Sequence, residues 1–168
     1  IEGMRAVAIL PVVLMHGGVE RLPGGFLGVA IFFVISGYLI TRILAREWAA
    51  GQFSYAGFYR RRAARILPAM TVMVAICLAL GAVFLLPFDA AALGWSALSA
   101  SAFAANVHFY ASTNYFNAFN TQILLHLWSL GVEEQFYLLY PLLFVAISRR
   151  WPRHRTVLIG VLQVVSLL

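Results

Sequence analysis

Two groups of ionisable residues lie inside apolar stretches of this sequence, where a charged side chain is costly and usually serves a function. The first group is Arg5 and His16, which are eleven positions apart. Because three helical turns take about 10.8 residues, the two side chains share one face of a helix. A neutral imidazole can take up a proton near neutral pH, so His16 is a candidate general base, with hydrogen-bonded packing as the alternative.

The second group follows one face of a later apolar run. Counted from His126, offsets of 3, 7 and 11 give a polar stripe made of His126, Ser129, Glu133 and Tyr137. Glu134 lies beside this polar stripe. Burying two adjacent carboxylates within a membrane span costs on the order of 2.5–3.5 kcal/mol each. That cost favours a catalytic role for Glu133 over a purely structural hydrogen bond between helices.

A basic cluster precedes another apolar run and consists of Arg60, Arg61, Arg62 and Arg65. Arg62 and Arg65 are three positions apart and are therefore neighbours on a helix. A guanidinium group grips phosphate oxygens through two parallel hydrogen bonds, so Arg62 and Arg65 predict a phosphate site that would suit a donor such as coenzyme A. The alternative is that the cluster only orients the chain in the membrane.

A small polar pair, Ser36 and Gly37, lies midway along a further apolar run. Such a pair either lets two helix backbones approach closely or lines a cavity at the depth of His16. In the second case Ser36 would support the chemistry of the histidine.

The composition of the chain indicates the kind of environment that surrounds these residues. Of the 168 residues, 62% are hydrophobic and 11% are charged, whereas a soluble domain is about a quarter charged. Lipid must therefore solvate most of the chain. The net charge of +6 comes from twelve arginines and no lysine, and their clustering argues against a nucleic-acid-binding face. The single cysteine, Cys77, excludes a disulfide framework and a multi-cysteine metal site.

The apolar runs predict an all-α fold, a polytopic transmembrane helical bundle of about five to six segments. The stronger segments are residues 4–18, 26–44, 66–88 and 123–148, and a further span begins after residue 155. Pro68 would then fall in the first turn of its helix, where proline is tolerated. Residues 90–110 form a weaker segment that is rich in alanine and serine.

Loop charge predicts the orientation of the chain in the inner (plasma) membrane. Residues 42–65 contain six arginines and residues 149–155 contain four, so both loops are expected in the cytoplasm. Two loops on one side require an even number of crossings between them. Residues 90–110 are therefore expected to be re-entrant or interfacial, unless one basic loop violates the rule. The residues that this topology brings to similar depth are His16, Ser36 and Glu133.

Four motifs, in order along the chain, resemble one known family. They are Arg5 and His16 separated by ten residues, GFLGVAIFFVISGYLIT at 25–41, Arg62-x-x-Arg65 before Ile66-Leu67-Pro68, and HLWSL at 126–130 followed by Glu133 and Phe136-Tyr137. Together they resemble acyltransferase family 3, membrane proteins that include bacterial O-acetylases of lipopolysaccharide and peptidoglycan. Two positions depart from the pattern: Ala30 stands where the family usually has aspartate, and Ile123 where it commonly has proline.

The resemblance implies transfer of an acyl group, often acetyl, from cytoplasmic acyl-CoA to a hydroxyl of an extracytoplasmic glycan or related acceptor. Acyl-CoA would be a donor substrate, with no permanently bound cofactor and no metal. Arg62, Arg65 and Arg5 would bind its phosphates. The resemblance and the apolar ends also imply that residues 1–168 are the N-terminal part of a longer domain, cut at both ends.

The remaining candidate residues fit the acyl transfer step. His16 would be the general base or a transient acyl carrier, and Glu133 would orient or charge-balance its imidazole. Ser36 or Tyr137 would hydrogen-bond the reacting carbonyl. The supporting residues are His126, Ser129 and Glu134.

The rival interpretation is a fragment of a proton-coupled transporter or channel, in which buried His and Glu side chains relay protons. It explains ionisable residues within spans equally well, but it does not explain Arg62-x-x-Arg65 beside a span. A third interpretation is a membrane scaffold without chemistry, in which Glu133 affects stability alone.

Overall fold

The computed structural model of the chain describes residues 2–16, 27–112, 123–153 and 157–160. These residues contain no strand and form an all-α bundle, as the sequence predicts. The helices, in order, are α1 (Glu2–His16), α2 (Leu27–Ala49), α3 (Tyr55–Phe84), α4 (Pro87–Ser101), α5 (Ala105–Ser112) and α6 (Leu127–Arg150). A single further helical turn covers residues 157–160.

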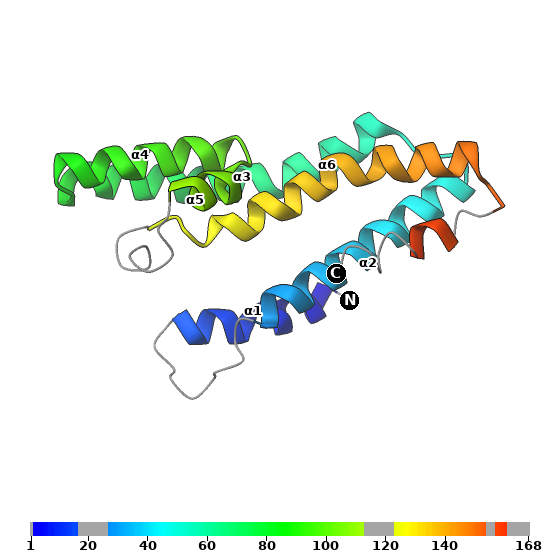
Figure 1. Cartoon of the computed structure of the whole chain (residues 1–168), viewed down its shortest axis with the longest axis horizontal. Coiled ribbons are helices and arrows are strands. Elements are labelled where there is room, and N and C mark those ends of the chain that lie inside the picture. Colours follow the sequence, from blue (N-terminus) through cyan, green and yellow to red (C-terminus); the bar gives the residue numbers. More distant parts are fainter. Residues whose placement is uncertain (1, 17–26, 113–122, 154–156, 161–168) are drawn as a thin grey trace.

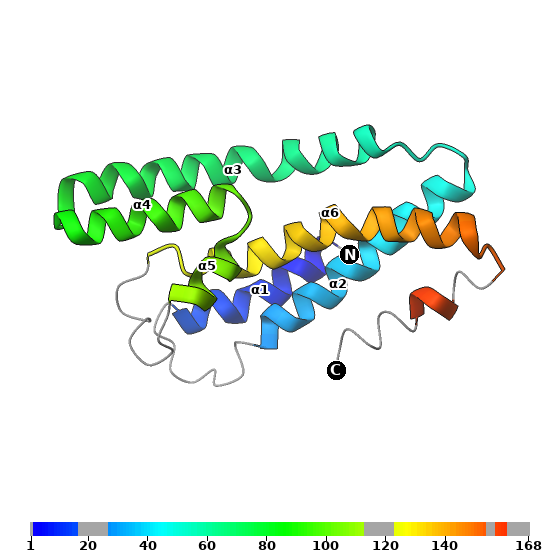
Figure 2. The ribbon, with the colours of Figure 1, turned by 45° about the horizontal axis from the view of Figure 1, so that its top comes forward.

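Helix α6 is the centre of the bundle. Figures 1 and 2 show α6 between α3, on one side, and the pair formed by α1 and α2, on the other. Helices α2 and α6 pack together and run in the same direction, whereas α3 runs in the opposite direction. Helix α4 folds back along the second half of α3, and α5 packs on α6. This arrangement lets three different elements contact α6.

Two apolar cores lie along the length of the bundle. The first contains buried side chains of α3, α4, α5 and the start of α6, among them Met70, Leu93, Phe109 and Leu127. The second contains buried side chains of α2, α3 and the later part of α6, among them Leu44, Phe58, Tyr140 and Phe144. The part of α6 that carries Glu133 lies between the residues that enter these two cores.

A close approach of α1 and α2 depends on one glycine. A β-carbon added to Gly28 would lie 2.2 Å from the backbone oxygen of Ala8 and 2.8 Å from a methyl carbon of Val12. Ala8 and Gly28 are both buried. Small residues at such a contact let two membrane helices pack backbone to backbone.

Helix α3 begins earlier than expected. The sequence predicts a span that begins at Ile66, with Pro68 in its first turn, but the helix begins at Tyr55 and Pro68 lies in its interior. Ser54 caps the helix by accepting a hydrogen bond from the backbone N–H of Gly57 at 3.3 Å. Because this cap starts the helix before the basic cluster, Arg60 to Arg65 become helical residues. Membrane helices tolerate an interior proline where neighbours satisfy the freed carbonyl.

Residues 90–110 form two short helices instead of one segment. Helix α4 has 15 residues, α5 has 8, and the chain bends between them at Phe103, whose φ is +54°. Among the described helices, those with the length and hydropathy to cross a membrane are α2, α3 and α6. The chain therefore changes direction within this segment, and neither of its two helices has the length of a candidate span. Whether the segment crosses the membrane stays a prediction.

Both arginine-rich loops lie at one end of the bundle. The guanidinium carbon of Arg149 lies 5.9 Å from the centre of the Trp48 ring, which joins the end of α6 to the end of α2. Arg61 forms an ion pair with Glu47 at 2.6 Å, which joins the start of α3 to the same end of α2. The basic residues of both loops therefore lie at the same end of the bundle.

Helix α6 begins later than expected. The predicted span begins at Ile123, but residues 123–126 form turns and the helix begins at Leu127. His126 precedes the first helical turn and makes no side-chain capping bond. Of the span expected after residue 155, the structure describes only the turn at 157–160, so the rest of that prediction lies outside the described residues.

Candidate functional site

The buried carboxylate of Glu133 is the centre of the candidate site. Its Oε1 atom accepts a hydrogen bond of 2.9 Å from the hydroxyl of Ser36, across the contact between α2 and α6. Ser36 is 2% exposed and Glu133 is 6% exposed. The structure thus brings together two residues that the sequence predicts at similar depth.

Tyr137 is a second hydroxyl donor to the same oxygen. It follows Glu133 by one helical turn and donates to Glu133 Oε1, and its side chain is 2% exposed. A carboxylate oxygen can accept more than one hydrogen bond, so two donors hold the carboxyl group in one orientation. This is the part of the polar stripe that the fold buries.

Arg62 links this carboxylate to the basic cluster. Its guanidinium carbon lies 4.6 Å from the centre of the Tyr137 ring and 5.8 Å from that of Phe58. Nearby, the Tyr59 hydroxyl donates to the backbone oxygen of Leu138 at 2.8 Å, which fixes α3 against α6. We call Ser36, Glu133, Tyr137 and Arg62 the Glu133 site. Three helices, α2, α3 and α6, contribute to it.

Arg65 differs from Arg62 in its surroundings. Arg65 is exposed, whereas Arg62 is half-buried against aromatic rings. The two residues lie close on the same helix, as predicted, but their side chains meet different environments. An exposed guanidinium is accessible to a soluble phosphate group, and a stacked one is constrained by its ring.

A second polar bridge between α2 and α6 was not predicted. The hydroxyls of Thr41 and Tyr140 are 2.6 Å apart. Thr41 donates to the backbone oxygen of Gly37 at 2.8 Å, so Tyr140 is the donor in the bridge between the two helices. Tyr140 follows Glu133 by seven positions, two helical turns, and that spacing could have identified it. The two bridges fix the register of α2 against α6.

A reciprocal amide pair fixes α5 against α6. Asn106 and Gln135 exchange side-chain hydrogen bonds of 3.1 and 2.9 Å, and the Gln135 amide also donates to the backbone oxygen of Phe103 at 2.9 Å. Gln135 therefore satisfies a carbonyl at the bend between α4 and α5. The sequence shows both amides inside apolar segments, but nothing in their spacing indicates that they meet.

Several predicted site residues do not join the Glu133 site. His126 is exposed, and Ser129 donates to the backbone oxygen of His126 at 3.1 Å instead of pointing to the carboxylate. Glu134 is half-buried beside Glu133. The predicted polar stripe is therefore divided: His126 is exposed and Ser129 half-buried, whereas Glu133 and Tyr137 are buried against α2 and α3. In the first turn of α6 it is the apolar side chain of Leu127, on a different face, that packs against α3.

Arg5 and His16 are placed by their backbone alone. Both lie in α1, which packs on α2, the helix that carries Ser36. Their side chains lie outside the described part of the structure. Their roles therefore stay predictions from the sequence.

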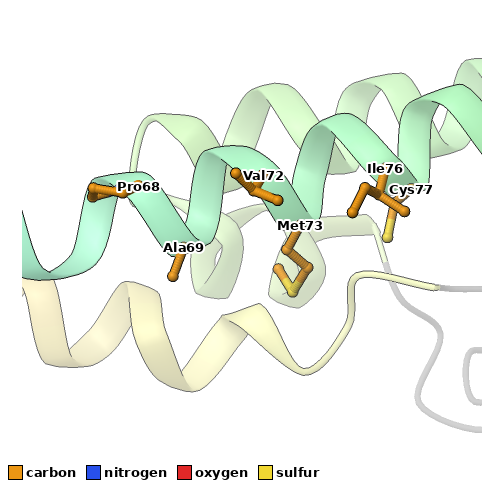
Figure 3. Close-up of a pocket in the computed structure, with 6 residues that line it drawn as sticks. All are labelled: Pro68, Ala69, Val72, Met73, Ile76 and Cys77. Carbon is orange, nitrogen blue, oxygen red and sulfur yellow. The ribbon is translucent and has the colours of Figure 1, made fainter.

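Outside the Glu133 site, the described residues form an apolar groove but no cluster of metal-ligating side chains. No group of three or more His, Cys, Asp or Glu side chains among them could hold a metal ion. An open groove runs along α3 and is apolar throughout; Figure 3 shows its lining residues, Pro68, Ala69, Val72, Met73, Ile76 and Cys77. Cys77 is half-buried there and is the one thiol of the chain. The groove offers surface for apolar chains but no acid or base.

Comparison with known proteins gives a consistent result over the whole chain. The family described as "Acyltransferase domain" (Acyl_transf_3) matches residues 1–168. O-acetyltransferase OatA of Staphylococcus aureus strain NCTC 8325 / PS 47 is 39% identical over 172 residues, covering 100% of this chain and 28% of its own length. OatA of strain COL gives the same identity and coverage. The chain thus spans less than a third of the length of these relatives. No solved structure gives a significant match.

Proposed function

The chain belongs to the acyltransferase domain family, and we propose that the protein containing it transfers an acyl group, acetyl in the simplest case, from acyl-CoA to a hydroxyl group of an extracytoplasmic glycan. The observation that carries the proposal is the buried Glu133 carboxylate, held by Ser36 and Tyr137 at a contact of three helices. A fixed buried carboxylate in an apolar bundle is costly and is a functional candidate by default. The O-acetyltransferase name of the OatA relatives supports acetyl and an oxygen acceptor.

The proposed reaction needs a base, a donor site and an acceptor. A base removes the proton of the acceptor hydroxyl, its oxygen attacks the thioester carbonyl, and the carbon–sulfur bond breaks. The products are an ester and free coenzyme A, whose thiolate takes up the proton. His16 is the proposed base, or it carries the acyl group transiently. Glu133 is proposed to charge-balance the reaction from α6. It does not lie beside His16, because Ala8 of α1 lies against Gly28 of α2, the two helices run in opposite directions, and His16 and Ser36 lie on opposite sides of that contact along the bundle.

The donor is proposed to bind at the basic end of the bundle. Acyl-CoA is cytoplasmic, and loop charge favours a cytoplasmic position for the arginine-rich loops in the inner (plasma) membrane. Arg65, which is exposed, and Arg62 and Arg5 are proposed as ligands of the coenzyme A phosphates. The acceptor is proposed to be a cell-envelope carbohydrate, such as lipopolysaccharide or peptidoglycan.

Transfer of labelled acetyl tests the proposal. Membranes that contain the protein at its natural full length are given radiolabelled acetyl-CoA and purified peptidoglycan or lipopolysaccharide as acceptors. We expect label in the acceptor, and about a hundredfold or larger loss in His16→Ala and in Glu133→Gln. The Gln side chain can still accept hydrogen bonds from Ser36 and Tyr137. A loss of transfer activity in Glu133→Gln therefore reports the missing negative charge more than a change of fold.

Two outcomes would contradict the proposal. Transfer that continues unchanged in both variants removes His16 and Glu133 from the mechanism. Proton movement across vesicle membranes, without any acyl transfer, would instead favour the proton-coupled transporter or channel. Arg60→Gln is the matched control for surface charge, because Arg60 is an exposed arginine on the same turn of α3.

A further inference from the structure

We infer that Arg62 acts as a positioning residue for Tyr137, and through it for Glu133, whereas Arg65 supplies the contact with the phosphates of the donor. The inference rests on the proposed function. It assigns different roles to Arg62 and Arg65, which the sequence alone does not distinguish. It changes the role of Arg62 from ligand to internal support.

The position of Arg62 in the bundle is the first step. Figures 1 and 2 show that α3 begins inward of the ends of α2 and α6. Arg62 lies two turns into this helix, and its side chain is half-buried. A half-buried guanidinium needs contacts that offset its loss of hydration.

Two aromatic rings lie against the Arg62 guanidinium. The guanidinium carbon is 4.6 Å from the Tyr137 ring centre and 5.8 Å from the Phe58 ring centre, and both rings are 2% exposed. A guanidinium that stacks on a ring face interacts with the negative face of the π system. The stacking contact uses the face of the guanidinium, so the rings fix the direction in which its N–H donors point. Arg65 is exposed, so a soluble phosphate group can reach its guanidinium.

The effect on Glu133 follows from the hydroxyl of Tyr137. A cation on the ring face draws electron density from the ring, which makes the phenolic hydroxyl a stronger hydrogen-bond donor. That hydroxyl donates to Glu133 Oε1, the same atom that accepts from Ser36 at 2.9 Å. Arg62 therefore supports the orientation of the carboxylate through Tyr137, and it also restricts the movement of the ring.

Steady-state kinetics on the full-length protein separates the two roles. Arg62→Gln is expected to lower kcat about tenfold or more with the KM for acetyl-CoA within about twofold of wild type. Arg65→Gln is expected to raise that KM about tenfold with a smaller effect on kcat. Arg62→Lys retains a cation that can lie on the ring and should recover most of the lost kcat. Arg60→Gln is the exposed-charge control.

A double-mutant cycle tests whether Arg62 acts through Tyr137. Tyr137→Phe removes the hydroxyl but keeps the ring, and it should lower kcat without changing the KM for acetyl-CoA. In that background Arg62→Gln should cost much less than it costs alone, because its route to Glu133 has already been removed. Tyr137→Phe keeps the test available if Arg62→Gln fails to fold.

The outcomes separate this inference from the proposed function. If wild type transfers acetyl but Arg62→Gln raises the KM for acetyl-CoA as Arg65→Gln does, with kcat unchanged, the inference is wrong and the proposed function stands. If the two changes, Arg62→Gln and Tyr137→Phe, lower kcat independently, so that their fold-effects multiply in the double variant, the inference is also wrong. If wild type transfers no acetyl from acetyl-CoA, the proposed function itself fails, and the inference fails with it.

Discussion

Ser36 and Glu133 are 97 positions apart in the sequence, yet the hydroxyl of one lies 2.9 Å from the carboxylate of the other in the interior of the bundle. The contact joins α2 to α6, and Tyr137 and Arg62 extend it to α3. One bond therefore depends on the relative placement of helices from distant parts of the chain.

Removing the hydroxyl of Ser36 should destabilise the protein. Ser36→Ala leaves Glu133 with one fewer donor in a buried position, and we expect a loss of roughly 1–2 kcal/mol of unfolding free energy. Unfolding of the purified protein in detergent measures the change. Ser101→Ala is the control, because Ser101 donates only to a backbone oxygen of its own helix. An equal change in both variants would show that the bond to Glu133 contributes nothing of its own.

Adding a methyl group at Gly28 should separate α1 from α2. The added carbon would lie 2.2 Å from the backbone oxygen of Ala8, and a backbone atom cannot move away cheaply. We expect Gly28→Ala to lower stability by about 1–3 kcal/mol. Gly94→Ala in α4 meets nothing within 4 Å and should be neutral or slightly stabilising. Equal stability of the two variants would argue against close packing of α1 on α2.

The amide pair of Asn106 and Gln135 should behave as one unit. Asn106→Ala, Gln135→Ala and the double variant form a cycle, and we expect a coupling energy of roughly 0.6–1.7 kcal/mol in detergent unfolding. Each single change leaves the other amide without its reciprocal partner. A coupling energy near zero would mean that the pair does not hold the bend at Phe103.

Both basic loops should be accessible from the same side of the membrane. In a variant with Cys77→Ala, single cysteines at the exposed positions Arg46 and Arg150 should react with a membrane-impermeant maleimide only when the cytoplasmic face is open. The reason is that the ends of α2 and α6 meet through Trp48 and Arg149. Labelling from opposite faces would show that the segment between the loops crosses an odd number of times.

The bridge between Thr41 and Tyr140 should control register more than chemistry. Tyr140→Phe removes the donor to Thr41 while the ring stays packed on Phe136, and we expect a loss of about 0.5–1.5 kcal/mol. Transfer activity, measured with labelled acetyl-CoA, should fall less than in Tyr137→Phe, since Tyr137 contacts the carboxylate and Tyr140 does not. The reverse order of activities would place the chemistry nearer Tyr140.

Composition and helical periodicity are enough to predict the class of fold and the main local features. Long apolar runs with few charges can form only helices in lipid, because the backbone must satisfy its own hydrogen bonds there. Spacing identified Glu133 and Tyr137 as one helical face, and the clustering of arginines predicted which loops lie together. These conclusions depend on composition and helical periodicity, which a single sequence contains in full.

Which faces of the helices meet depends on packing across the whole bundle. Periodicity shows that a helix has a polar face but not which other helix covers it, so it could not show that Ser36 reaches Glu133. For the same reason it could not show that Arg62 stacks on Tyr137 while Arg65 is exposed, or that Gln135 pairs with Asn106. Periodicity also could not show that Glu133 and Tyr137 are the buried members of the polar stripe, because their burial depends on where α6 contacts its neighbours. Such contacts follow from the packing of whole helices, and that packing depends on many side chains at once.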